Sequence, residues 1–120
     1  MARVFLDTNA YIDAVHRKTE INRQFTGHKV FYSTLSTHIL FYASKLKVPH
    51  KATYATEEEF EVIDFTSSIL KNALTGPTPD LEDNIQLHSA AEAECDYFLT
   101  SDKKLLAMTY FGKTKIVRTL

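Results

Sequence analysis

The chain has 120 residues, of which 44% are hydrophobic and 24% are charged, a composition typical of a globular protein that excludes a disordered chain. Fourteen Lys and Arg residues nearly balance fifteen Asp and Glu residues, which excludes a uniformly basic nucleic-acid-binding protein. Cys95 is the only cysteine, so an intramolecular disulfide and a cysteine-rich zinc site are excluded. We therefore expect a single domain over residues 1–120 of a cytoplasmic protein without a membrane span.

Strand and helix patterns alternate along the chain. Short apolar runs predict strands at residues 4–6, 30–32, 60–65 and 97–99, and a last strand at 116–117 at the edge of the sheet. Helices are predicted over residues 8–17, 20–25, 34–47, 67–74, 80–94 and 102–108, whereas the polar segment 50–59 is ambiguous. This alternation predicts an α/β fold with a mostly parallel sheet.

Acidic residues follow the predicted strands at positions that such a fold brings together. Asp7 comes directly after the first strand, Asp102 follows the fourth strand, and Asp83 lies near the start of the helix over 80–94. Ligands of open α/β sheets bind beyond the carboxyl ends of the strands. Carboxylates gathered without thiolates or matched histidines favour Mg²⁺ or Mn²⁺. The corresponding chemistry is metal-assisted attack of water on a phosphodiester bond.

Each of these acids also has a purely structural interpretation. Asp7 and Asp102 are placed to cap the helices that follow them, and Asp80 and Asp83 have the spacing of a capping box. Asp83 also complements the dipole of its own helix. The metal hypothesis therefore depends on the joint placement of the acids and on none of them alone.

Three motifs in this order carry a family resemblance: V-F-L-D-T-N at residues 4–9, D-L-E-D-N-I-Q at 80–86 and D-Y-F-L-T-S-D-K at 96–103. Together they resemble the PIN-domain nucleases, and among these the small VapC-like toxins of toxin–antitoxin systems, over essentially the whole chain. The resemblance implies a three-layer α/β/α fold with a central, mostly parallel sheet of four or five strands. It also implies a ribonuclease that depends on Mg²⁺ or Mn²⁺.

The resemblance also assigns roles to individual residues. It implies that Asp7, Asp83 and Asp102 are the catalytic metal ligands, and supporting polar roles fall to three further residues, Asn9, Thr100 and Ser101.

One acid of the family pattern is missing. The family usually has a Glu six residues after the Ser that ends the second strand, and the residue six positions after Ser33 is Ile39. His38 is adjacent to this vacancy but points about one helical step away, which makes it a poor substitute ligand.

The missing acid leaves two functions open: an endoribonuclease whose activity is reduced or absent, or a degenerate PIN domain that binds RNA or protein without cleavage. Candidate RNA contacts are Lys103 and the basic run of Lys45, Lys47 and Lys51, although an ordinary solvated surface also explains that run. The resemblance further implies a cognate antitoxin and a homodimer. A phosphoacceptor receiver domain is disfavoured, because no second Asp ends a strand near the middle of the chain.

Overall fold

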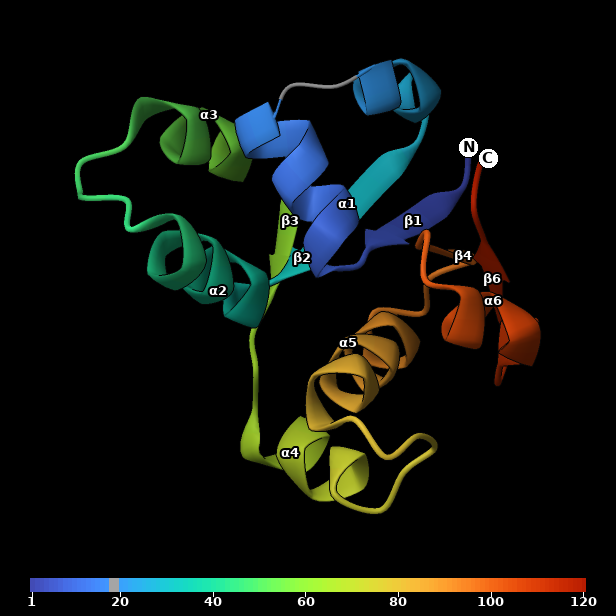
Figure 1. Ribbon diagram of the computed structural model, residues 1–120. Coiled ribbons are helices and arrows are strands. Elements are labelled where there is room, and N and C mark those ends of the chain that lie inside the picture. Colours follow the sequence, from blue (N-terminus) through green and yellow to red (C-terminus); the bar gives the residue numbers. More distant parts are fainter. Residues whose placement is uncertain (18–19) are drawn as a thin grey trace.

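The computed structural model describes residues 1–17 and 20–120. Within these residues, six strands form one mixed, mostly parallel sheet in the order β3-β2-β1-β4-β6-β5, in which only the pairing of β5 with β6 is antiparallel (Figure 1). The strands are β1 (Arg3–Leu6), β2 (Lys29–Ser33), β3 (Glu61–Ile63), β4 (Tyr97–Leu99), β5 (Tyr110–Phe111) and β6 (Thr114–Val117). The α-helices are α1 (Thr8–Ile12), α2 (Thr34–Ser44), α3 (Lys51–Glu59), α4 (Ser67–Ala73), α5 (Leu81–Glu92) and α6 (Lys103–Met108). A π-helical turn (Asp13–Arg17) follows α1, and a 3-10 helix (Glu20–Phe25) precedes β2.

Helices cover both faces of the sheet, which gives three layers (Figure 1). Successive side chains of a strand point to opposite faces, so β1 contributes to two separate cores. Val4 and Leu6 pack in a buried cluster with residues of α1 and α2. Phe5 packs in a second cluster with residues of α5 and α6, where its ring stacks on Phe98 with centroids 5.6 Å apart. The predicted three-layer α/β fold is confirmed.

Short polar side chains start the helices directly at the ends of the strands. The first residue after β1, Asp7, accepts a hydrogen bond from the backbone of Ala10 and so caps α1. Ser33, the last residue of β2, caps α2 in the same way. Such caps satisfy backbone N–H groups that have no partner inside the helix. They also fix where each helix leaves the carboxyl edge of the sheet.

Two helical boundaries differ from the sequence prediction. The ambiguous segment 50–59 is helical over α3, and His50 caps it by accepting a hydrogen bond from the Thr53 N–H at 3.4 Å. The helix expected to reach residue 47 ends at Ser44, because Lys45 has a left-handed φ of 51°. Both features depend on local capping geometry, which hydrophobic periodicity does not encode.

The edge of the sheet also differs from the prediction. β6 was expected at the edge, but β5 covers it as an antiparallel neighbour, and the sheet has six strands where four or five were expected. The two strands form a tight hairpin whose turn includes Gly112, with a positive φ of 60° that glycine adopts without strain. The two-residue strand β5 is too short to give a pattern in the sequence. None of the helices in the described part of the chain has the length and hydrophobicity of a membrane-spanning segment.

The packing of α2 against the sheet gives a stability prediction. Leu40 of α2 is 0% exposed within the first core cluster, whereas Leu74 is 66% exposed. We expect Leu40→Ala to lower the free energy of unfolding by about 2–5 kcal/mol, because it leaves a cavity in a packed core. Leu74→Ala, the same substitution at an exposed position, is the control and should change it by less than about 1 kcal/mol. Urea unfolding measures both, and equal losses would contradict the described packing.

Candidate active site

Three acids from separate parts of the chain meet at the carboxyl edge of the sheet. β1 and β4 are adjacent and parallel, with Leu6 paired to Leu99, so the residues that follow them emerge side by side. Asp7 follows β1, Asp102 lies three residues after β4, and Asp83 lies in the first turn of α5. Charge repulsion couples Asp83 to both of the other acids. The three acids therefore lie close enough to interact electrostatically.

Asp7 is the buried member of this cluster. Its side chain is 8% exposed, and its Oδ1 accepts a hydrogen bond from the Ala10 N–H at 2.8 Å. Its Oδ2 accepts a hydrogen bond from the Thr100 hydroxyl at 2.5 Å. Burial raises the pKa of Asp7, and these two hydrogen bonds oppose that rise. Two donors therefore hold a buried carboxylate in one orientation.

Thr100 connects this carboxylate to the loop of Asp102. The Thr100 hydroxyl that donates to Asp7 also accepts a hydrogen bond from the Asp102 N–H at 3.0 Å. Thr100 is 2% exposed, so its hydroxyl has no competing solvent partner. Of the three supporting polar residues that the resemblance implies, Thr100 alone hydrogen-bonds to an acid through its side chain within the described part of the chain. Asn9 and Ser101 are exposed and make no such bond.

Asp83 is the member with the strongest electrostatic perturbation. Partial burial and then repulsion from four neighbouring acids, Asp80 first, raise the pKa of Asp83 to about 6. Across residues 1–17 and 20–120, no Lys or Arg forms an ion pair with any of the three clustered acids. A carboxylate that is crowded by like charges and lacks a cationic partner favours either a proton or a bound cation.

Asp102 and the two lysines after it line an open hollow beside the cluster. Asp102 caps α6 through Oδ1, which accepts hydrogen bonds from the N–H groups of Lys104 at 2.8 Å and Leu105 at 3.3 Å. The hollow has a volume of about 690 Å³, and Asp83, Asp102, Lys103 and Lys104 lie along it. Carboxylates for a cation and ammonium groups for a phosphate are thus present in one hollow.

The donor set fits a hard divalent cation in its chemistry. All three side chains offer oxygen, and Oδ2 of Asp102 accepts no hydrogen bond from the described residues. Over the same residues, however, no three side chains of His, Cys, Asp or Glu are grouped closely enough to hold a metal ion. An ion at this edge would therefore take part of its coordination shell from water or from substrate oxygens, as Mg²⁺ usually does.

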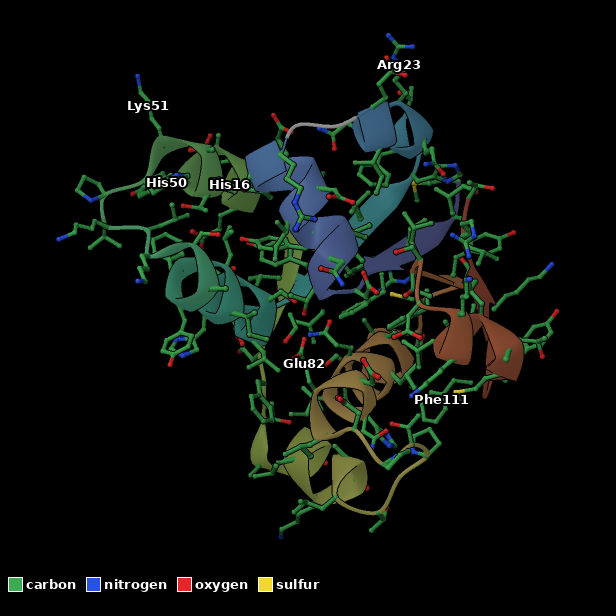
Figure 2. The ribbon with its side chains drawn as sticks, in the orientation of Figure 1. His16, Arg23, His50, Lys51, Glu82 and Phe111 are labelled. Carbon is green, nitrogen blue, oxygen red and sulfur yellow. The ribbon has the colours of Figure 1, made fainter. Side chains whose placement is uncertain are left out.

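The basic run predicted as an RNA contact lies elsewhere. Lys45, Lys47 and Lys51 are exposed in the connection from α2 to α3 and at the start of α3, and none of them lines the acidic hollow. Figure 2 shows Lys51 and His50 at one end of the molecule, away from Glu82 at the start of α5. Of the predicted RNA contacts, only Lys103 lies beside the acids.

His38 does not replace the missing acid. It is exposed on α2, its ring stacks against Tyr42 with centroids 6.5 Å apart, and it lines a different hollow from Asp83 and Asp102. Ile39 is partly buried, one helical turn after the buried Ser36. The structure therefore places an apolar side chain where the family pattern has its second acid, and no neighbouring residue on α2 compensates for it.

Sequence reasoning missed a buried polar group at the same edge. Thr8, Ser36 and Gln86 are each at most 7% exposed, and their side chains hydrogen-bond to one another. Gln86 lies between the buried residues Ile85 and Leu87 on α5. A long polar side chain among buried neighbours was the signal available in the sequence, because such residues are rarely buried without a partner.

Comparison with known proteins identifies the fold. No protein-family model matches the sequence, and no curated protein matches it. Among solved structures, the chain is similar to a chain of the crystal structure of VapBC2 from Rickettsia felis bound to a DNA fragment from their promoter. The TM-score is 0.66 at 14% sequence identity, and the match covers 96% of this chain and 97% of that chain. The chain therefore has a PIN-like fold, as predicted.

The raised pKa of Asp83 gives a prediction of pH dependence. Between the ordinary value of 3.8 and about 6, the folded protein binds the Asp83 proton more tightly than the unfolded chain does. The free energy of unfolding should therefore fall as the pH rises through this window, and the raised pKa of Asp7 acts in the same direction.

We expect Asp83→Asn to be more stable than the unsubstituted protein at pH 8 by about 1 kcal/mol, a value reduced for solvent screening, and this difference should vanish below about pH 4. Glu92→Gln on the exposed side of the same helix removes the same charge and is the control. Urea unfolding at the two pH values measures the effect. An equal gain in both variants would mean that net charge, and not the cluster, is responsible.

Proposed function

We propose that this protein is a PIN-type endoribonuclease that hydrolyses RNA phosphodiester bonds with Mg²⁺ or Mn²⁺, and that it is the toxin of a toxin–antitoxin pair. The observation that carries the proposal is the meeting of Asp7, Asp83 and Asp102 at the carboxyl edge of a PIN-like sheet. These carboxylates repel one another and lie beside Lys103 and Lys104. Carboxylates beside lysines suit a substrate whose phosphate binds to the lysines and whose metal counterion binds to the carboxylates.

In this proposal, some residues bind the cation or the RNA through their charge, and another residue orients a cation ligand. Asp7, Asp83 and Asp102 would hold the cation, which supplies activation of water and stabilisation of the developing charge. Thr100 keeps the buried Asp7 carboxylate oriented and favours its ionised form. Lys103 and Lys104 attract the RNA backbone to the hollow.

We also propose that this protein binds a protein partner. The matched structure contains VapBC2 bound to a DNA fragment from their promoter, and the motifs of this chain resemble VapC-like toxins. We propose a cognate antitoxin that binds this chain, and a homodimer of the chain. We further propose that residues 1–120 form one PIN-like domain.

A second function is favoured by one observation, the apolar Ile39 at the position of the family's second acid. With one carboxylate fewer, the cluster attracts a cation less strongly. A degenerate PIN domain that binds RNA or protein without cleavage is therefore the alternative, and cleavage assays separate the two.

The first test is cation binding by the acidic cluster. We expect the unsubstituted protein to bind Mn²⁺ in a calorimetric titration and Asp7→Asn to lose at least about ten-fold in affinity, because the substitution removes a buried carboxylate. Asn also caps helices well, so α1 should persist in the variant. Glu92→Gln serves as the control and should bind normally.

The same proteins should differ in RNA cleavage. We expect the unsubstituted protein to cut single-stranded RNA in the presence of Mn²⁺, and Asp7→Asn to be inactive. Cation binding without cleavage would favour the binding alternative. Failure of the unsubstituted protein to bind Mn²⁺, with and without a non-cleavable RNA, would reject the nuclease proposal.

The missing acid gives a gain-of-function prediction. Ile39 lies one turn after Ser36, whose hydroxyl hydrogen-bonds to Thr8 next to Asp7, so a carboxylate at position 39 would face the cluster. We expect Ile39→Glu to bind Mn²⁺ several-fold more tightly and to cleave RNA faster. Glutamine has the same shape as glutamate without its charge, so Ile39→Gln should show neither gain. Identical behaviour of the two variants would show that position 39 does not contribute to the cation site.

A further inference from the structure

The triad formed by Thr8, Ser36 and Gln86 joins three helices at the carboxyl edge of the sheet. The Gln86 side-chain N–H₂ group donates to the Thr8 hydroxyl at 3.0 Å and to the Ser36 hydroxyl at 3.2 Å. The two hydroxyls are themselves 3.1 Å apart, within hydrogen-bond distance. Thr8 belongs to α1, Ser36 to α2 and Gln86 to α5. One amide nitrogen therefore hydrogen-bonds to residues of two other helices.

The triad connects two different layers of the fold. α1 and α2 lie on one face of the sheet, and α5 lies on the other (Figure 1). Apolar side chains pack each helix onto its own face, and Leu35 of α2 also packs against the buried cluster that includes Ile85 of α5. The triad is a hydrogen-bonded link between the layers at the place where the acids meet.

Packing alone does not explain the choice of these residue types. Burying an amide and two hydroxyls is unfavourable unless each is hydrogen-bonded, and apolar side chains of similar size commonly give equal or greater stability. Every buried side-chain nitrogen and oxygen of the described residues has at least one hydrogen-bond partner, so no atom of the triad is left unpaired. Hydrogen bonds depend on direction where apolar packing does not, so the triad fixes a geometry.

Two of the three triad members are close in sequence to an acid of the cluster. Thr8 directly follows Asp7, and Gln86 lies one helical turn after Asp83 on α5. The relative placement of α1 and α5 determines how far Asp7 is from Asp83. The hydrogen bond from Gln86 to Thr8 acts on that placement one residue from Asp7 and one helical turn from Asp83.

We propose that Gln86 is a positioning residue, whose buried amide sets the placement of Asp83 relative to Asp7 by holding α5 against α1 and α2. The inference deepens the proposed function, because it assigns a geometric control to the proposed cation site. Gln86 does not line the hollow, and among the described residues its side chain hydrogen-bonds to Thr8 and Ser36, through which it acts.

The test uses Gln86→Met, which keeps the length of the side chain and removes both donors. The remaining hydroxyls of Thr8 and Ser36 can still hydrogen-bond to each other, so the fold should survive. Leu87→Met on the same helix is the matched control, because Leu87 is 0% exposed in the second core cluster. It perturbs the packing of α5 without touching the triad.

The first readout is free of metal and of activity. A double-mutant cycle of Asp7→Asn and Asp83→Asn, measured by urea unfolding at pH 8 and low salt, gives the coupling free energy between the two acids. We expect this coupling to change by about half or more when Gln86→Met is added, and to stay the same when Leu87→Met is added. General destabilisation of α5 cancels in the cycle, so an unchanged coupling would overturn the inference.

The second readout is cation affinity. We expect Gln86→Met to weaken Mn²⁺ binding by about 10- to 100-fold, the effect typical of residues that orient metal ligands, and Leu87→Met to leave it unchanged. Equal Mn²⁺ affinity in all three proteins would also reject the positioning role. If the unsubstituted protein binds no Mn²⁺, the proposed function fails by itself, and the coupling cycle still decides the role of Gln86.

Discussion

The site depends on the hydrogen bond between the Thr100 hydroxyl and the Asp7 carboxylate. A carboxylate that is buried at the end of the central strand is unfavourable unless donors compensate for the water it has lost. Thr100 comes from the neighbouring strand end, so this donor exists only because β1 and β4 are paired in register. The same hydroxyl accepts from the Asp102 backbone, which ties the second acid to the first. The hydrogen bond to the buried Asp7 carboxylate and the link from Asp7 to Asp102 therefore both depend on the pairing of β1 with β4.

Capping and cation binding are compatible uses of the same carboxylates. The structural interpretation of the sequence was correct as far as it went, because Asp7, Asp80 and Asp102 each cap a helix. A capping carboxylate uses one oxygen for the backbone N–H groups, and at Asp102 the other oxygen remains without a hydrogen bond from the described residues. The cap also restricts the rotation of the side chain. A cap at the end of a strand is therefore an oriented donor, which a cation site requires.

The sequence predicted the alternation of strands and helices and the main strands, because these depend on hydrophobic periodicity, and the family resemblance predicted the three layers. It did not predict α3, since that helix begins at a His50 cap with little amphipathic pattern behind it. The hairpin partner β5 was missed because two residues carry no periodicity. The basic run that includes Lys45 was predicted to contact RNA, but the path of the chain places it away from the acids. Counting charges along the sequence does not reveal this separation. The Gln86 triad was missed because its partners are 78 and 50 residues away in the sequence.

The replacement of the family's second acid by Ile39 affects the cluster in two opposing ways. Without a cation, partial burial and then repulsion from neighbouring acids already raise the pKa of Asp83 to about 6. A further carboxylate at the same edge would increase this repulsion and lower the stability of the cation-free protein. Ile39 removes that unfavourable term, and it removes with it part of the attraction for a cation. Because the two effects have the same electrostatic origin, the proposed function implies that Ile39 gives both a more stable ligand-free fold and a weaker cation site. Such a domain is expected to depend more on substrate phosphate to complete the coordination of its cation.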